Sequence, residues 1–407
     1  MYFSKNKNRK EKINMSNYVF YDGELLERAG GPSTYLYNLR DELLKTKKND
    51  YKFITRKKQP EYKKKKIYKK LKQTAVESFP KVYEKVMIKH HLSEGEMFKK
   101  LPEIQDMELV HFHSTSNFVK AKKYLKKDVI TLLMSHSPEI TSKQVAQGLR
   151  DKYKGKYDFK KIEEFYLNNF DIPAFKEADV LIFPSEEAME PYYQTCNNFE
   201  DIIKDKNIKY IMTGTKPLKY KIEKDEFRKQ YNIPKEAVVI CFVGRHNDVK
   251  GYDNFIQISQ KLLKQNDNIY IVTAGIGPID SPKESRWIDL GWTNDPGSAV
   301  NASDVFVLPN KRTYFDLVLL EVLSLGKTCV VSNTGGNKTV AKLTNGVITY
   351  DSIEQAVTTI MDLSKNLEKL NNLSQENINA YNNYFTVEKF AERYDNLINE
   401  IKNEVKK

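Results

Sequence analysis

The chain has 407 residues, of which 40 % are hydrophobic and 12 % aromatic. This composition excludes a disordered protein, and the length suits two α/β domains of about 200 residues each. No run approaches the roughly 18 apolar residues of a membrane-spanning helix. The three cysteines, Cys196, Cys241 and Cys329, lack the spacing of a disulfide framework or a zinc site, so we expect a protein of the reducing cytoplasm.

The net charge of +13 lies almost entirely in the first quarter of the chain. Residues 1–100 hold 26 Lys and Arg against 12 Asp and Glu, whereas the other 307 residues hold 41 against 42. The excess is concentrated between residues 56 and 72, where either a solvated basic face or a surface for anionic lipid accounts for it. Because no nucleic-acid motif accompanies these lysines, we predict no nucleic-acid partner and a peripheral contact with the anionic inner face of the cell membrane.

Short apolar runs alternate with helical patterns along the chain, as in parallel sheets whose strands are buried on both faces. The first series of predicted strands comprises residues 18–21, 51–54, 109–113, 129–134, 180–183 and 208–212. The second comprises 238–243, 269–273, 305–308, 328–331 and 346–350, and the chain after residue 352 has a helical pattern. Helical crossovers such as 34–44 and 254–263 join the strands. Two such series predict two Rossmann-like, doubly wound domains.

Turn residues between 213 and 217 separate the two series. We therefore expect an N-terminal domain over 17–217, a C-terminal domain over 218–385 and a terminal helix within 386–407. Residues 1–16 are charged and lack an apolar core, so we expect a disordered extension rather than a secretory signal.

Ligands of open α/β sheets bind beyond the carboxyl ends of the strands, so the loops there are the candidate site. The first such loop carries Gly30 and Gly31, followed by Ser33 as the expected N-cap of the next helix. Glycines before a helix let the backbone approach a phosphate or a sugar. A plain loop-to-helix turn has the same sequence, so the pair indicates little by itself.

A second loop follows the predicted strand 238–243 and carries Arg245 and Lys250 before the next helix. A guanidinium and an ammonium near a helix N-terminus suit a diphosphate, although two surface cations would have the same spacing. In a third segment Glu321 stands within a run of Leu and Val. A carboxylate there is costly to bury without hydrogen-bond donors, so it is either a satisfied structural group or a ligand of a ribose diol.

Further candidates lie on neighbouring loops. Gly275, Gly277 and Trp292 follow adjacent strands and could frame a nucleotide base. His113 and His136, with His111, end neighbouring strands of the first domain. A strand-end histidine is usually structural, and no acidic ligand is spaced with these three, so we expect no metal site and no cofactor.

In their order along the chain, these motifs resemble the retaining, family-4 glycosyltransferases of the GT-B fold, from about Tyr18 to the end. The resemblance implies two Rossmann-like domains that face a cleft, the N-terminal one for the acceptor and the C-terminal one for a nucleotide-diphosphate sugar. It also implies that the terminal helix packs back on the N-terminal domain. The expected reaction is a metal-independent hexosyl transfer in the assembly of a bacterial surface polysaccharide or glycoconjugate, with a lipid-linked glycan, a polysaccharide or a protein as acceptor.

By the same resemblance, Arg245 and Lys250 hold the diphosphate and stabilise it as it leaves. Glu321 holds the ribose, Gly30 and Gly31 approach the phosphate or the sugar, and His136 touches the donor sugar. The sequence departs from the family at Thr313, where a glutamate is usual, and Tyr314, Phe315, Asp316 and Leu317 follow it. That glutamate would contact the donor sugar, so sugar specificity is open, and Asp316 is the candidate replacement.

Two other classes of function remain alternatives at this point. A nucleotide-sugar epimerase could use the same paired domains, although no carboxylate pair is apparent for it. A catalytically silent homologue that assists another glycosyltransferase would account for Thr313, although Arg245 and Lys250 argue for donor binding.

Overall fold

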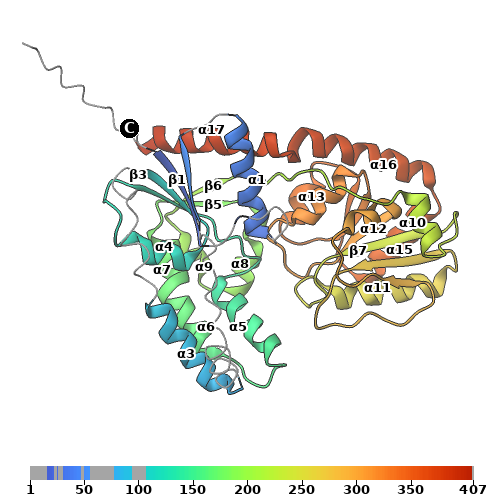
Figure 1. Cartoon of the computed structure of the whole chain (residues 1–407), viewed down its shortest axis with the longest axis horizontal. Coiled ribbons are helices and arrows are strands. Elements are labelled where there is room, and N and C mark those ends of the chain that lie inside the picture. The colour runs from blue at the N-terminus through green and yellow to red at the C-terminus, as the bar shows by residue number, and fades with distance from the viewer. Residues whose placement is uncertain are drawn as a thin grey trace, which may run out of the picture.

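The computed structural model of the protein describes residues 16–22, 25, 31–46, 50–55, 78–93 and 107–405. Two six-stranded parallel sheets, each flanked by helices, form the two halves of the molecule (Figure 1). The basic run between residues 56 and 72, Gly30 and residues 1–15 lie outside the described residues.

The first sheet has the strand order β2-β1-β3-β4-β5-β6. Its strands are β1 (Ser16–Tyr21), β2 (Tyr51–Thr55), β3 (Met107–Phe112), β4 (Ile130–Leu133), β5 (Val180–Phe183) and β6 (Asn207–Tyr210). Its helices are α1 (Gly31–Lys45), α3 (Pro80–Ser93), α4 (Thr115–Lys122), α5 (Thr141–Lys152), α6 (Lys160–Tyr166), the π-helix η3 (Leu167–Asp171), α7 (Ile172–Glu177), the 3-10 helix η4 (Glu187–Met189), α8 (Glu190–Thr195) and α9 (Phe199–Ile203). The order reverses between β1 and β3, which is where open sheets bind ligands.

The second sheet has the order β12-β11-β10-β7-β8-β9 and reverses between β7 and β10. Its strands are β7 (Val238–Val243), β8 (Ile269–Ala274), β9 (Trp287–Asp289), β10 (Val305–Leu308), β11 (Thr328–Ser332) and β12 (Val347–Tyr350). Its helices are α10 (Lys224–Gln230), α11 (Tyr252–Gln265), α12 (Pro296–Ala302), α13 (Leu317–Ser324), α14 (Gly336–Ala341), α15 (Ile353–Ser364), α16 (Leu367–Ala380) and the π-helix η5 (Tyr381–Phe385).

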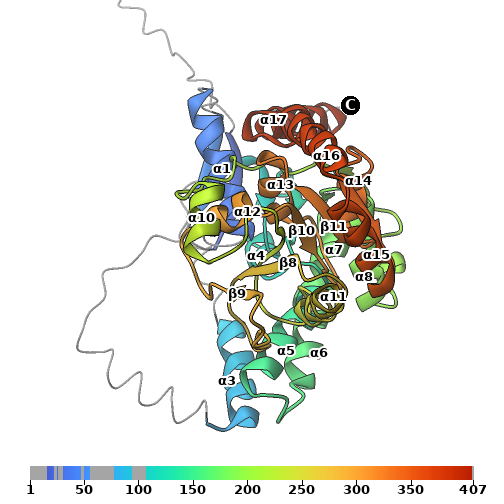
Figure 2. The ribbon, with the colours of Figure 1, turned by 90° about the vertical axis from the view of Figure 1, so that its right-hand side faces the viewer.

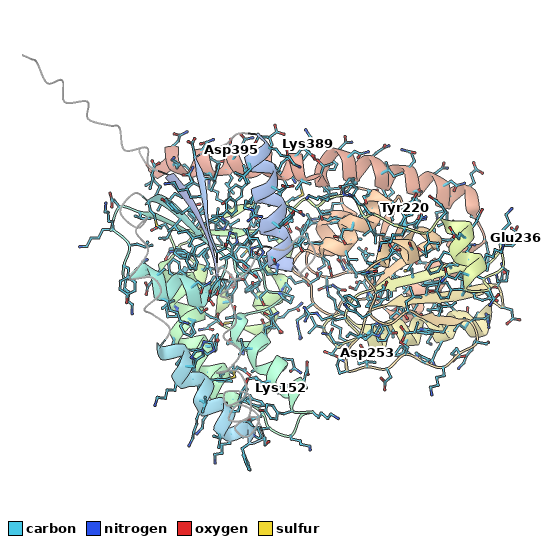
Figure 3. The ribbon with its side chains drawn as sticks, in the orientation of Figure 1. Lys152, Tyr220, Glu236, Asp253, Lys389 and Asp395 are labelled. Carbon is cyan, nitrogen blue, oxygen red and sulfur yellow. The ribbon has the colours of Figure 1, made fainter. Side chains whose placement is uncertain are left out.

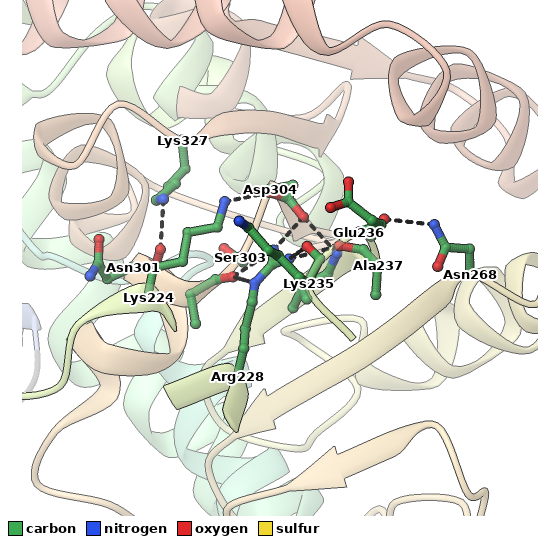
Figure 4. A network of polar contacts seen from close by, with 12 residues as sticks. Lys224, Arg228, Lys235, Glu236, Ala237, Asn268, Asn301, Ser303, Asp304 and Lys327 are labelled. Atoms are coloured by element: carbon green, nitrogen blue, oxygen red, sulfur yellow. Dashed lines mark hydrogen bonds and ion pairs between the residues drawn. The ribbon is translucent and has the colours of Figure 1, made fainter. Parts of the chain in front are cut away.

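A buried polar network holds the amino-terminal edge of the second sheet, on the side away from the ligand-binding edge (Figure 4). Asp304 accepts hydrogen bonds from Lys224 Nζ at 2.8 Å, from Arg228 Nη2 at 2.7 Å and from the Val239 amide at 2.8 Å. Lys327 Nζ donates to the Asn301 carbonyl at 2.8 Å, and burial lowers its pKa to about 8. The Asp304 bonds join α10 to the starts of β7 and β10, and the Lys327 bond joins the start of β11 to α12.

The last helix, α17 (Val387–Val405), crosses from the second half of the molecule to the first (Figure 1). Lys209 on β6 bonds Glu400 and Glu404 of α17 at 2.7 and 2.6 Å. Tyr51 on β2 donates to Asp395 at 2.9 Å. The apolar face that α17 buries comprises Phe390, Ala391, Tyr394, Leu397, Ile398 and Ile401.

The two halves also meet through polar side chains after β5. The hydroxyls of Ser185 and Thr339 lie 2.6 Å apart. Glu190 on α8 accepts from the Gly335 amide at 3.0 Å and from Lys338 Nζ at 2.9 Å. The carboxyl-terminal edges of the two sheets therefore face each other.

The predicted strands all form, and the structure adds one strand and corrects several boundaries. The short edge strand β9 was not predicted, and β6 ends at Tyr210 rather than at residue 212. Ser33 is not an N-cap, because α1 already begins at Gly31 and Ser33 is buried in its first turn. Ser16, placed in the expected extension, is the first residue of β1. No helix in the described ranges is both long and apolar enough to cross a bilayer.

Candidate active site

The loop between β7 and α11 carries the two predicted phosphate ligands. Arg245 is exposed, and no hydrogen bond or ion pair joins its guanidinium to another described residue. Lys250 lies at the other end of the loop, where its ammonium forms an ion pair with Asp316. This loop follows β7 at the point where the strand order reverses, which is the expected place for a nucleotide.

The neighbouring loop after β8 packs backbone against backbone on the Arg245 loop. The Gly244 amide donates to the Ala274 carbonyl at 3.0 Å, and the His246 amide donates to the Ile276 carbonyl at 3.1 Å. A Cβ atom at Gly275 would lie 1.8 Å from the Gly244 carbonyl oxygen. One at Gly277 would lie 2.1 Å from the His246 carbonyl oxygen. Both glycines thus allow the backbone of this loop to pack closely against the Arg245 loop.

Asp316 holds Lys250 from the loop that follows β10. Its Oδ2 atom also accepts a hydrogen bond from Asn310 Nδ2 at 2.8 Å. Burial alone would raise the pKa of Asp316, but the Lys250 ammonium and the Asn310 amide outweigh burial and hold it below its usual value. The carboxylate therefore stays ionised and paired with Lys250.

The residues just before Asp316 are directed into the protein. Thr313 is 3 % exposed, and its carbonyl lies against Gly335. Tyr314 reaches into the first half of the molecule and donates to the Ile182 carbonyl at 3.3 Å. Phe315 packs near Phe385, with ring centroids 6.4 Å apart. These three side chains are buried, and Leu317 begins α13 directly after Asp316.

Glu321 lines a small pocket of about 40 Å³ between the two halves. The other lining residues come from α1 and from the connection between the halves: Thr34, Asn38, Thr215, Lys216, Pro217, Leu218 and Lys219. Asn38 is 1 % exposed, and neither its amide nitrogen nor its amide oxygen has a hydrogen-bond partner among the described residues. Sequence reasoning missed Asn38, although it follows Thr34 by four residues and so shares its helix face.

Three histidines form a buried cluster at the ends of β3 and β4. His113 Nδ1 lies 2.6 Å from His136 Nε2, and His111 Nδ1 lies 3.0 Å from the Tyr394 hydroxyl on α17. Burial lowers the pKa of His111 and of His136 to about 3 and that of His113 well below its usual value, so all three are neutral. The Tyr35 ring of α1 packs on His136, with centroids 4.6 Å apart.

His136 faces the second half of the molecule, where its ring centroid lies 6.5 Å from that of Tyr314. Its backbone has a φ of 55°, a conformation that is uncommon for a residue other than glycine. Three residues later, buried Glu139 forms a 3.3 Å ion pair with Arg312, directly before Thr313. Burial raises the pKa of Glu139, and the nearby Arg312 guanidinium offsets only part of this rise. Sequence reasoning did not find this pair, because its partners are distant in the chain.

Trp292 lies on the loop after β9, at the same edge of the second sheet. It is 72 % exposed, and Ile276 on the adjacent loop is 60 % exposed. The Gly275 amide joins the two loops by a 2.8 Å bond to the Gly291 carbonyl. A flat exposed ring beside the phosphate loop can stack on a base. In the part of the chain that the structure describes, no group of three or more His, Cys, Asp or Glu residues is placed to hold a metal ion.

The second half of the molecule carries a recognisable family signature. Residues 223–380, which include Arg245, Lys250 and Glu321, match the family model of the glycosyl transferases group 1. This part of the chain therefore carries the sequence pattern of the group 1 glycosyl transferases, and the two paired sheets have the GT-B fold.

Curated relatives of the chain act in glycan assembly, by their names. It is 25 % identical over 186 residues to UDP-Gal:alpha-D-GlcNAc-diphosphoundecaprenol alpha-1,3-galactosyltransferase of Escherichia coli, covering 41 % of this chain and 47 % of that protein. It is 26 % identical over 192 residues to the Escherichia coli O-antigen biosynthesis glycosyltransferase WclY, covering 45 % and 52 %. The chain therefore spans about half the length of these curated relatives.

Solved structures support the fold over almost the whole chain. Sucrose-phosphate synthase from Thermosynechococcus elongatus superposes with a TM-score of 0.61 at 15 % identity, covering 95 % of this chain and 99 % of that one. HepE from Anabaena, solved with UDP and glucose, gives a TM-score of 0.57 at 14 % identity, with the same coverage. At this identity the likeness concerns the fold alone.

Proposed function

We propose that this protein transfers a sugar from a nucleoside-diphosphate donor to an acceptor, with retention of configuration at the reacting carbon. The observation that carries the proposal is the pair of cations, Arg245 and Lys250, on one loop at the reversal point of the second sheet. Two cations on one loop there can bind a diphosphate and stabilise the charge that develops as it leaves.

The other residues of the site fit this assignment. Glu321 and Asn38 line a pocket where carboxylate and amide groups can receive ribose hydroxyls. Trp292 offers an exposed ring for the base. His136 lies at the opposite edge, where a neutral imidazole can accept or donate a hydrogen bond to the donor sugar without placing a positive charge there.

The proposed step is a front-face displacement. The bond between the anomeric carbon and the diphosphate oxygen breaks, the acceptor hydroxyl attacks from the same face, and its proton passes to the leaving phosphate. No side chain has to act as a strong base in this scheme, so the two cations supply most of the stabilisation. A neutral His136 is compatible with this role.

The acceptor is a further part of the proposal. The relative named above as a galactosyltransferase acts, by its name, on a diphosphoundecaprenol-linked sugar. We propose a glycan acceptor in surface polysaccharide or glycoconjugate assembly, at the inner face of the membrane.

The decisive experiment is incubation of the purified protein with a panel of nucleotide sugars and with lipid-linked acceptors. We expect release of the nucleoside diphosphate and an α-linked product from an α-linked donor. Arg245→Ala and Lys250→Ala should each lower kcat/KM by about 100-fold or more, which is roughly 3 kcal/mol. Near-normal turnover in both variants would remove the cations from the site. A change in the stereochemistry of the free nucleotide sugar would indicate an epimerase, and no reaction with any donor would indicate a silent homologue.

We further propose that the reaction needs no divalent metal, because Arg245 and Lys250 already balance the diphosphate charge. Turnover should persist in a strong chelator. Complete loss of turnover in chelator, restored by Mg²⁺ or Mn²⁺, would contradict this proposal.

A further inference from the structure

Helices α3, α5 and α6 form an arm that projects from the first half of the molecule, away from α17 (Figure 1 and Figure 2). Lys152, at the end of α5, marks its outer end in Figure 3. Nothing in the proposed transfer reaction uses this arm, yet its surface combines two unusual features.

The first feature is apolar. Phe79, Val82 and Val86 are 64 %, 47 % and 48 % exposed. Their spacing of three and four residues places them on one face of α3. The opposite face of the helix is anchored, since buried Glu84 accepts hydrogen bonds from the Tyr157 hydroxyl at 2.8 Å and from the Ile162 amide at 2.9 Å. The apolar face is thus held outward by a fixed helix.

The second feature is charge. Lys81, Lys85 and Lys89 are exposed on α3 beside the apolar face, and none forms an ion pair with another described residue. The turn between α5 and α6 lies next to them, because Lys152 Nζ sits 4.5 Å from the centre of the Tyr83 ring. The exposed lysines of this turn and of the start of α6 are Lys152, Lys154, Lys156, Lys160 and Lys161. Against these eight lysines the same segments expose only Asp151, Asp158 and Glu164.

We infer that the outer end of this arm docks on an anionic lipid bilayer, with Phe79, Val82 and Val86 entering the headgroup boundary and the lysines contacting the lipid phosphates. A helix with an apolar face bordered by lysines lies in the plane of such an interface. The lysines supply the attraction to anionic lipid, and the apolar side chains leave water on docking.

The chemistry of the arm favours lipid over nucleic acid. Single-stranded nucleic acids bind where basic grooves carry aromatic rings on which bases stack. Among the described residues, the large apolar side chains that the arm exposes are two valines and one phenylalanine, so they offer little for stacking but match acyl chains. The inference is also separate from the basic run at residues 56–72, because it concerns side chains of α3 and of the turn between α5 and α6.

The test is co-sedimentation of the full chain with vesicles of phosphatidylglycerol and phosphatidylcholine, against phosphatidylcholine alone. We expect binding to the anionic vesicles that weakens as salt rises, since exposed charges are screened within about 8 Å at physiological ionic strength. Replacing Lys81, Lys85 and Lys89 by glutamine should reduce the partition coefficient by at least about 10-fold, since each lysine near the surface adds roughly fivefold. Replacing Phe79, Val82 and Val86 by glutamine should also reduce the partition coefficient on anionic vesicles by at least about 10-fold. This variant should not gain binding to neutral vesicles.

The matched control replaces three exposed lysines of the second half by glutamine: Lys229, Lys235 and Lys264. This variant should bind anionic vesicles like the wild type. Release of nucleoside diphosphate from the donor in the absence of vesicles should be unchanged in the arm variants, so a failure here is distinguishable from a failure of the proposed reaction. Wild-type binding in both arm variants, or no binding by the wild type, would overturn the inference. If a single-stranded oligonucleotide displaced the protein from the vesicles, the arm would instead be a surface that binds nucleic acid.

Discussion

At the scale of single residues, Asn38 provides a direct test of the donor pocket. A buried amide without partners costs about 1–3 kcal/mol, a cost that a ligand or water can offset. Asn38→Leu should leave the stability of the free protein unchanged or raise it, while the KM for the donor rises by roughly tenfold through a lost hydrogen bond. Thermal unfolding and initial rates measure the two effects.

Asn377 is the matched control for this variant. It is equally buried, but its amide accepts from Thr344 and donates to the Lys327 and Gly346 carbonyls at 2.8 and 3.0 Å. Each of these hydrogen bonds is worth about 1 kcal/mol, so Asn377→Leu should lower the free energy of unfolding by the sum of several such bonds. The KM for the donor should not change. If Asn38→Leu behaves like Asn377→Leu, then Asn38 is a structural residue and not a donor ligand.

Asp316 tests the departure from the family motif. Because its carboxylate holds Lys250, a diphosphate must share that lysine with a negative charge close by. Asp316→Asn keeps the shape and removes the charge, so we expect a nucleoside diphosphate to bind about 10-fold more tightly, as measured by calorimetry. Thr313→Val, at a buried position that faces Gly335, should change this affinity little. Weaker binding in Asp316→Asn would mean that the carboxylate chiefly positions Lys250.

At the scale of elements, α17 supports the histidine cluster of the first half through Tyr35. Phe390 packs on Tyr35 with ring centroids 4.7 Å apart, and Tyr35 in turn packs on His136. Phe390→Ala should cost about 3–5 kcal/mol of stability and also lower kcat, because Tyr35 loses its support. Ile401→Ala, on the same buried face but three turns along, should destabilise the fold by about 2–5 kcal/mol with a normal kcat at permissive temperature. Equal kcat values in the two variants would refute a special role for Phe390.

The strands and the site loops could be predicted because their signals are local. A run such as Val238–Val243 is apolar throughout, and parallel strands place their following loops at one edge. The three-residue strand β9 has too little pattern to be distinguished from a loop. The pairs Lys250–Asp316 and Glu139–Arg312 join residues far apart in sequence, so no spacing rule reveals them. Asn38 is a polar residue in an ordinary helix, and only the packing of α1 against the second half shows that it is buried.

At the scale of the whole molecule, the histidine cluster makes stability depend on pH. His111, His113 and His136 are neutral when folded, with pKa values far below the usual value near 6.5. In the unfolded chain they take up protons as the pH falls through about 6.5. Burial lowers the pKa of His246 in the second half in the same direction. The contribution of these buried neutral histidines to the free energy of unfolding is thus complete above pH 6.5 and is lost as the pH falls from there towards about 3.

One buried acid opposes this trend. Burial raises the pKa of Asp171 to about 6, so the folded protein binds a proton there before the unfolded chain does, and this group adds stability as the pH falls through about 6. The three buried histidines of the same half act in the opposite direction. Each lowers the free energy of unfolding by up to roughly 1.4 kcal/mol per pH unit below 6.5. The net effect is a loss of stability on mild acidification, before ordinary carboxylates begin to titrate.

We therefore expect the urea midpoint of the first half to fall between about pH 7 and pH 5, with a proton uptake on unfolding of one to two. His136→Asn should flatten this dependence, because the amide can still bond His113 Nδ1 but takes up no proton in the unfolded chain. Asp171→Asn should steepen it, because the opposing group is gone. If the pH dependence of the urea midpoint were identical in the wild type and in both variants, other groups would control the acid stability of the protein.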